Sequence, residues 1–178
     1  MNFKRLFATF LVTVPFTLAA TEPSPVAPPE RAAVLSAARA VMTQAHFTTL
    51  ITIGDTGQPQ ARVLDPSEPD SDFTVWLGTN PLSRKVAQLR HNPMATLSYF
   101  DRSTLSYVTL LGSATLVPDQ ATKDKHWQAS WAPFYPQGSK SANFALLRFT
   151  PTSLEIVSLS YKLYNDPQTS RPVIVTLP

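Results

Sequence analysis

The chain has 178 residues with 15 basic and 12 acidic side chains, which gives a formal net charge of +3. Its hydrophobic fraction of 43% is that of a globular protein, and its length predicts one domain with a short extension. The nearly balanced charge gives no indication of a nucleic-acid-binding protein or of one held on an anionic membrane. No cysteine is present, which excludes disulfides and a lipid attached through cysteine.

The first twenty residues have the features of a secretory signal peptide. Lys4 and Arg5 precede an apolar stretch over residues 6–18, and small residues suitable for cleavage follow it. The stretch is shorter than the ~20 apolar residues of a membrane-spanning helix. We therefore expect residues 1–20 to be a signal peptide and the protein to be exported to a periplasm without stable membrane insertion. An uncleaved N-terminal anchor is the alternative.

The next segments predict a linker, a helix and a hairpin. Residues 21–29 are rich in proline, which is typical of an extended linker. Residues 30–45 carry apolar side chains at helical spacing. Residues 46–53 and 60–64 predict two strands of a hairpin, because Asp55, Thr56 and Gly57 between them favour a turn in which the glycine can adopt a positive φ.

The middle of the chain predicts three strands and a second helix. Residues 73–78 form an apolar run typical of a strand, and residues 82–92 predict a helix that a proline ends. Residues 94–100 and 106–117 predict two more strands, the second with a bend or bulge at Gly112.

The last part of the domain predicts a helix and a hairpin, over residues 119–131 and over residues 144–149 with 154–159. Antiparallel strands with helices inserted at their connections predict a mainly β (α+β) fold built around a small barrel. The expected organisation is a signal peptide, a linker, one domain and a C-terminal tail, over residues 1–20, 21–29, 30–165 and 166–178.

The junction between the third strand and the second helix gathers donors for an anion. Thr79, Ser83, Arg84 and Lys85 lie where the strand ends and the helix begins. Helix N-termini carry free N–H groups and a partial positive charge, so they attract phosphate. The pattern indicates a pocket for a dianion. The alternative is an ordinary helix cap with exposed basic residues.

Several short motifs follow one another in a characteristic order: QARVL at 60–64, WLGTN at 76–80, SRK at 83–85, NP at 92–93, LSYF at 97–100, YVTLLGSA at 107–114 and LRFTPT at 147–152. In this order the chain resembles the pyridoxamine 5′-phosphate oxidase-like, FMN-binding split β-barrel family, and within it the general stress protein 26-like branch. The resemblance covers about residues 30–163. It implies a six-stranded antiparallel split β-barrel with about three peripheral helices, and a homodimer with FMN at the subunit interface.

The resemblance also implies which residues bind the FMN phosphate. Arg62 would hold it from one side, and Thr79, Ser83, Arg84 and Lys85 would complete the grip. A planar guanidinium offers bidentate, charge-assisted hydrogen bonds to a phosphate, and hydroxyls add neutral donors. The alternatives are a solvated hairpin arginine and a surface lysine.

For the flavin ring, the resemblance implies contacts with the backbone of Val63 and Leu64, and with Tyr107 on a neighbouring strand. Trp127 and Trp131 are four residues apart on a predicted helix, so they would share one face. Stacking of Trp131 on the ring is one interpretation, and a plain core position for the pair is the other.

The family resemblance implies a flavin-dependent oxidoreductase of unknown substrate. The alternative is a non-enzymatic module that binds, stores or senses flavin or another anionic cofactor, such as haem or a deazaflavin. Two departures argue against pyridoxamine phosphate oxidation: Tyr107 stands where those oxidases usually carry Gln, and residues 160–178 lack their substrate-binding Arg and His. The histidines show no metal-ligand spacing, so no metal site is predicted. No catalytic residue can be assigned.

Overall fold

The structure, a computed structural model, describes residues 29–164, 168–169 and 171–178. The predicted signal peptide and residues 21–28 of the predicted linker lie outside the described residues. The helices are α1 (Arg31–Ala45), α2 (Arg84–His91), α3 (Gln120–Lys125) and the 3₁₀ turns η1 (Ala129–Trp131) and η2 (Gly138–Lys140). The strands are β1 (Thr48–Ile53), β2 (Pro59–Leu64), β3 (Val75–Thr79), β4 (Met94–Asp101), β5 (Ser106–Leu116), β6 (Ala145–Val157) and β7 (Val173–Thr176).

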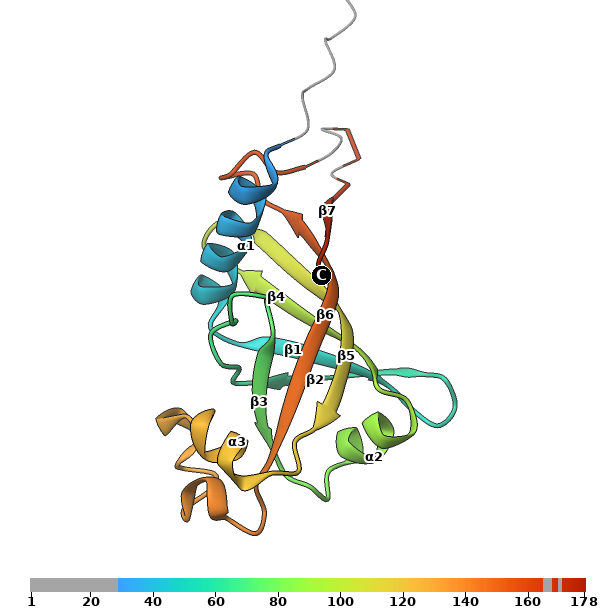
Figure 1. The fold of residues 1–178 in the computed structure, drawn as a ribbon. Helices are drawn as coiled ribbons and strands as arrows, with labels where there is room; N and C mark the ends of the chain where they lie inside the picture. The colour runs from blue at the N-terminus through green and yellow to red at the C-terminus, as the bar shows by residue number, and fades with distance from the viewer. Residues whose placement is uncertain (1–28, 165–167, 170) are drawn as a thin grey trace, which may run out of the picture.

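All seven strands belong to one antiparallel sheet in the order β2-β1-β4-β5-β6-β3, with β7 paired to β6 (Figure 1). The two ends of this path come together just beyond β2, where Pro66 bridges to Leu77 and the Ser67 N–H donates to the Trp76 carbonyl. Within the described chain β2 itself does not pair with β3. The six strands of the path therefore curve into the predicted barrel, which stays open between β2 and β3.

The predicted final hairpin is wrong. Most of residues 144–149 and 154–159 lies in one long strand, β6, which pairs with β5 over nearly its whole length. Pro151 is tolerated there because it falls between the part of β6 that pairs with β3 and the part that pairs with β7. The predicted bulge at Gly112 is confirmed, since the register between β5 and β6 shifts between Leu111 and Gly112.

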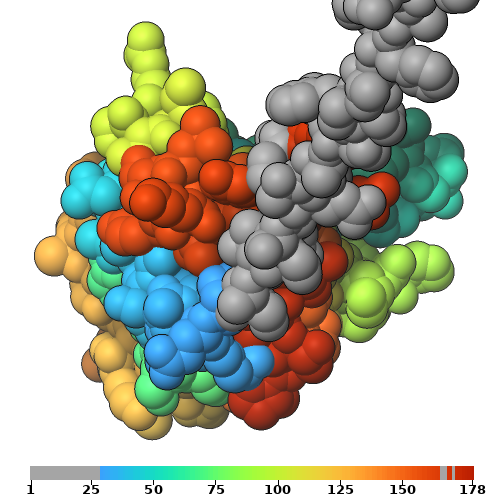
Figure 2. Space-filling view, turned by 90° about the horizontal axis from the view of Figure 1, so that it is seen from above, coloured from blue at the N-terminus to red at the C-terminus, as the bar shows by residue number. Residues whose placement is uncertain are grey.

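A seventh strand, β7, lies within residues 166–178, for which the sequence predicted no strand. Val173 and Val175 are buried and Ile174 is exposed, so this short segment shows the alternation of a half-buried strand. The blue start of α1 lies beside the dark red β7 segment in Figure 2. Arg31 and β7 together line a hollow there. β7 thus extends the sheet beyond the predicted six strands.

The predicted third helix is shorter than expected. The Asp119 carboxylate caps α3 by accepting from the N–H of Thr122 at 2.8 Å, but the helix ends at Lys125. Trp127 and Trp131 therefore do not share a helical face. Their rings still meet edge to face, with 5.9 Å between ring centroids.

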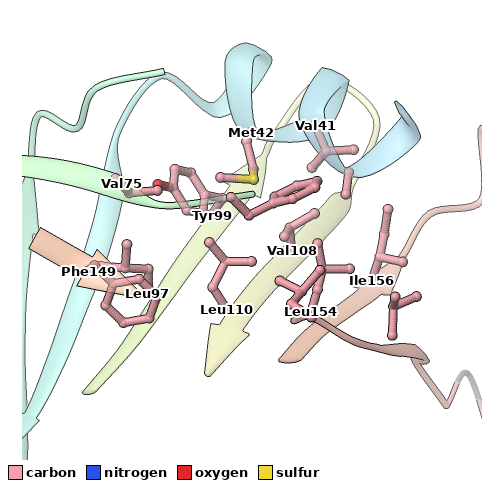
Figure 3. Packing of buried hydrophobic residues seen from close by; sticks show 14 of the residues in the cluster. Val41, Met42, Val75, Leu97, Tyr99, Val108, Leu110, Phe149, Leu154 and Ile156 are labelled. Carbon is pink, nitrogen blue, oxygen red and sulfur yellow. The ribbon is translucent and has the colours of Figure 1, made fainter. Parts of the chain in front are cut away.

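The core fills the barrel, and helices close its two ends. At one end, Val41 and Met42 of α1 lie over Tyr99 and the side chains of β5 (Figure 3). At the other end, α2 packs on β1 and β5 and buries Leu89. No helix among the described residues is both long and apolar enough to cross a bilayer. The end of the barrel that α2 closes is the end where the predicted anion-binding residues lie.

Candidate cofactor-binding site

A tight turn places the basic residues of α2 beside the end of β3. Asn80 begins the turn, its side-chain oxygen accepts from the Leu82 N–H at 2.8 Å, and its carbonyl accepts from the Ser83 N–H at 3.1 Å. Asn at the first position and Pro81 at the second are the residues this kind of turn favours. The chain therefore reverses within four residues, and α2 begins directly above the end of the barrel.

No described side chain caps the N–H groups of the first turn of α2 or compensates its positive end. Ser83 is the N-cap residue, but its hydroxyl makes no capping hydrogen bond, and the first turn contains no acidic residue. The Ser83 hydroxyl instead lies 3.5 Å from that of Thr79, to which the Lys85 ammonium donates at 2.9 Å. Two hydroxyls and an ammonium group thus lie together at the positive end of a helix.

Arg62 reaches this cluster from β2, and three cations lie near one another without a carboxylate. Burial and the nearby charge of Arg84 lower the pKa of Arg62. Burial and the charge of Arg62 lower the pKa of Lys85. No acidic side chain of the described chain contributes to either shift. Like charges held together in this way favour an anion as their counter-charge.

The pKa of Lys85 leads to a stability prediction. The folded chain binds the Lys85 proton less tightly than the unfolded chain, whose lysine titrates near 10.5. Between the two pKa values the unfolded state holds more protons, so the free energy of unfolding rises with pH. We expect the ligand-free protein to gain stability relative to its Lys85→Met variant as pH rises toward 10.5.

Urea unfolding of both proteins at a series of pH values checks this expectation. Lys125→Met, which removes an exposed lysine on α3, serves as the matched control and should follow the wild type. If the free energies of unfolding of Lys85→Met and of the wild type change in the same way with pH, Lys85 is not held in a repulsive environment.

A hollow of about 290 Å³ is lined by residues of β2 and β3, the two strands whose neighbouring positions carry Arg62 and Thr79. Val63 and Leu64 directly follow Arg62, and Gly78 directly precedes Thr79, so the same two strands line both features. The hollow is close in size to the smaller ligand pockets of proteins. Its lining is mostly apolar and aromatic: Phe47, Val63, Leu64, Asp65, Gly78, Trp131, Phe134 and Tyr135.

Trp131 forms one wall of this hollow and is fixed in place. It is 2% exposed, and its indole N–H donates to the Asp65 carbonyl at 3.1 Å. A Cβ added at Gly78 would stand 2.9 Å from the indole ring, so only glycine allows this packing. Trp131 therefore belongs both to a buried aromatic cluster and to the cavity wall. The core interpretation is confirmed, and the ring contact stays a prediction.

The structure places eight of the nine predicted binding residues in two groups and leaves one outside both. Arg62, Thr79, Ser83, Arg84 and Lys85 form the charged cluster, and Val63, Leu64 and Trp131 line the hollow. Tyr107 lies on the outer face of β5, two strands away from β1, and does not line the hollow of its own chain.

Sequence reasoning missed the residues that hold Arg62. Its guanidinium donates to the Thr52 hydroxyl at 2.6 Å, to the Gln88 side-chain oxygen at 3.2 Å and to the Leu50 carbonyl at 3.3 Å. Gln88 lies three residues after Lys85 and beside Leu89, on the buried face of α2. A polar residue at a buried position of a helix was the signal that could have revealed it.

The sequence matches the family described as pyridoxamine 5′-phosphate oxidase like over residues 36–158. No curated protein is significantly similar to the chain. Among solved structures, a Clostridium acetobutylicum protein related to general stress protein 26 of Bacillus subtilis has a TM-score of 0.67 and 19% identity. That alignment covers 81% of this chain and 93% of the other.

Two further structures share the fold. A heme binding protein from Mycobacterium smegmatis has a TM-score of 0.61 and 20% identity, with 85% of this chain and 60% of the other covered. A pyridoxamine 5′-phosphate oxidase-related, FMN binding protein from Nostoc punctiforme has a TM-score of 0.54 and 18% identity, with 83% and 96% covered. Because the match to the family spans well over half of the sequence, this chain belongs to the pyridoxamine 5′-phosphate oxidase-like family.

Proposed function

We propose that this protein binds FMN. One observation carries the proposal: Arg62, Arg84 and Lys85 converge without a carboxylate partner among the described residues, and the strand that carries Arg62 also lines a hollow with aromatic walls. A flavin phosphate is a dianion attached to a flat aromatic ring, so the two halves of the site match the two halves of the molecule. The FMN binding protein from Nostoc punctiforme, which shares the fold, supports the same assignment.

The donor set at the charged half suits a phosphate. Lys85 supplies an ammonium, Arg62 a guanidinium, and Thr79 and Ser83 supply hydroxyls. Charge-assisted bonds from such groups are the strong ones, and guanidinium geometry matches two phosphate oxygens. We propose that Arg62, Thr79, Ser83, Arg84 and Lys85 hold the phosphate.

At the apolar half, the chain would hold the ring and exclude water. We propose that Trp131 and the backbone of Val63 and Leu64, which line the hollow, contact the ring. Tyr135 adds a hydroxyl whose pKa burial raises, so that it keeps its proton. FMN supplies hydride or electron transfer when bound. We propose a flavin-dependent oxidoreductase activity, with the substrate unassigned.

We also propose that two chains associate through the outer face of the sheet. Met94 and Phe100 of β4 are 60% and 55% exposed, and Val63 of β2 is 65% exposed. Leu111 and Tyr107 on the same outer face are only partly covered. A second copy would bury these side chains. We propose that Tyr107 of the partner subunit then forms the far wall of the hollow.

Export is a separate proposal, which rests on residues 1–20 alone. Their basic start, apolar stretch and small residues have the order of a secretory signal. Fractionation of the cells that make the protein would test it, because full-length chain confined to the cytosol would contradict export.

Haem is a less suitable occupant of this hollow. The Mycobacterium smegmatis protein that shares the fold is a heme binding protein, so the fold does not exclude it. Among the residues that line the hollow, Tyr135 is the only one of a type that ligates haem iron. Burial raises the pKa of Tyr135, which opposes the phenolate that such ligation needs.

Spectroscopy of the purified protein tests this function. We expect a yellow protein, or one that becomes yellow with added FMN, whose visible flavin absorbance bleaches under anaerobic NADH or NADPH. Bound flavin that neither donor reduces would favour a storage or sensing module over an oxidoreductase. A haem-type Soret band, or no affinity for FMN, would contradict the proposed flavin site.

A further inference from the structure

The guanidinium of Arg62 is anchored by uncharged oxygens. Its Nη1 donates to the Thr52 hydroxyl at 2.6 Å and to the Leu50 carbonyl at 3.3 Å, and its Nη2 donates to the Gln88 side-chain oxygen at 3.2 Å. Charges taken out of water are usually paired with an opposite charge, and Arg62 is half-buried. Here the anchor supplies hydrogen bonds and leaves the positive charge uncompensated.

The network around this anchor fixes the direction of every hydrogen bond. The Thr52 hydroxyl has a single proton and donates it to the Gln88 side-chain oxygen at 2.6 Å, so it accepts from Arg62. The side-chain nitrogen of Gln88 donates to the side-chain oxygen of Gln60 at 2.9 Å. Thr52 is fully buried and Gln88 is 6% exposed, so the two residues at the centre of the network are shielded from water.

The same bonds leave one edge of the guanidinium available. A guanidinium has five N–H donors, of which the anchor uses three. Both protons of Nη1 are used, and Gln88 takes one proton of Nη2. No described residue accepts from Nε or from the second Nη2 proton. These two donors form the side of the guanidinium that binds two oxygens of one anion.

We infer that Gln88, together with Thr52, is a positioning residue that holds Arg62 through neutral oxygens, so that the phosphate alone neutralises its charge. The inference rests on the proposed function, and it explains why the site prefers a dianion. Gln88 does not touch the ligand. It fixes the guanidinium and, because its side chain is neutral, it adds no negative charge that would compete with the phosphate.

The decisive variant is Gln88→Glu, which keeps the shape of the side chain and adds one negative charge beside Arg62. It should raise the dissociation constant of FMN about tenfold or more, because the carboxylate neutralises the positive charge that otherwise attracts the phosphate. The dissociation constant of riboflavin, which has no phosphate, should stay the same. A change in the FMN to riboflavin ratio is a signature that a merely structural role of Gln88 would not give.

Two further variants complete the test. Ala87→Glu adds the same charge to an exposed position of α2, one residue away, and should change the ratio far less. Gln88→Met removes the anchor without adding charge, and it should weaken FMN but not riboflavin. It also keeps the test decisive if Gln88→Glu fails to fold.

The outcomes separate this inference from the proposed function. A wild-type protein that does not bind FMN would contradict the proposed function itself. A wild-type protein that prefers FMN to riboflavin, with folded Gln88→Glu and Gln88→Met variants that show the same preference, would overturn the role of Gln88 alone. Equal losses in Gln88→Glu and Ala87→Glu would also overturn it, because the effect would then be one of general charge.

Discussion

Replacement of Arg62 by alanine is expected to raise the dissociation constant of FMN by about 10-fold to 150-fold, which corresponds to about 1.5–3 kcal/mol for hydrogen bonds to a charged group. The reason is the pair of guanidinium donors that no described residue uses and the charge that no carboxylate neutralises. Thr52 and Gln88 still bond to each other in the variant, so the fold should persist.

Isothermal titration with FMN and with riboflavin measures this effect. Arg90→Ala, which removes an exposed arginine from the last turn of α2, is the matched control and should bind FMN as the wild type does. If Arg62→Ala binds FMN as tightly as the wild type does, Arg62 has no place in the phosphate site.

Replacement of Gly112 by alanine is expected to cost about 3 kcal/mol or more of the free energy of unfolding, at the upper end of the range for an added methyl group in a packed region. The added Cβ would stand 2.2 Å from the Thr150 carbonyl oxygen and 2.7 Å from the Pro151 Cα. Both are backbone atoms of the neighbouring strand β6, so no side-chain rotation relieves the clash. The bulge that bends β5 and β6 together would have to open.

Urea unfolding of the variant checks this expectation, with Gly57→Ala as the control. Gly57 has a φ of +80° and open space around its Cβ position, so alanine there costs only its backbone strain, about 1–2 kcal/mol. A Gly112→Ala protein as stable as Gly57→Ala would show that β5 and β6 do not approach each other this closely.

Local patterns predicted most of the elements, because each of them rests on short-range signals. The spacing of apolar residues predicted α1, and the turn with Gly57 predicted the hairpin of β1 and β2. The final hairpin failed because Pro151 looks like a turn residue in sequence. Only the sheet shows that Pro151 lies where β6 passes from one neighbour to another. β7 is too short to be recognised without the β6 edge that it extends.

The cationic residues of the site could be predicted from the sequence, but the residues that hold Arg62 could not. Ser83, Arg84 and Lys85 are consecutive, so a short motif identified them. Gln88 and Thr52 come from α2 and β1 and meet only in the folded barrel. The hollow likewise needs the loop that carries Trp131 to fold against Gly78, and nothing in the local sequence joins positions so far apart.

The most direct test of the central claim compares the affinities of the wild-type protein for FMN and for riboflavin, measured by titration in the same buffer. The two ligands share the ring and differ in the phosphate. If the uncompensated cations bind that phosphate, FMN should bind about 100-fold more tightly or better, which corresponds to about 2.7 kcal/mol. Equal dissociation constants would contradict the account, because the cluster of Arg62, Arg84 and Lys85 would then contribute nothing to binding.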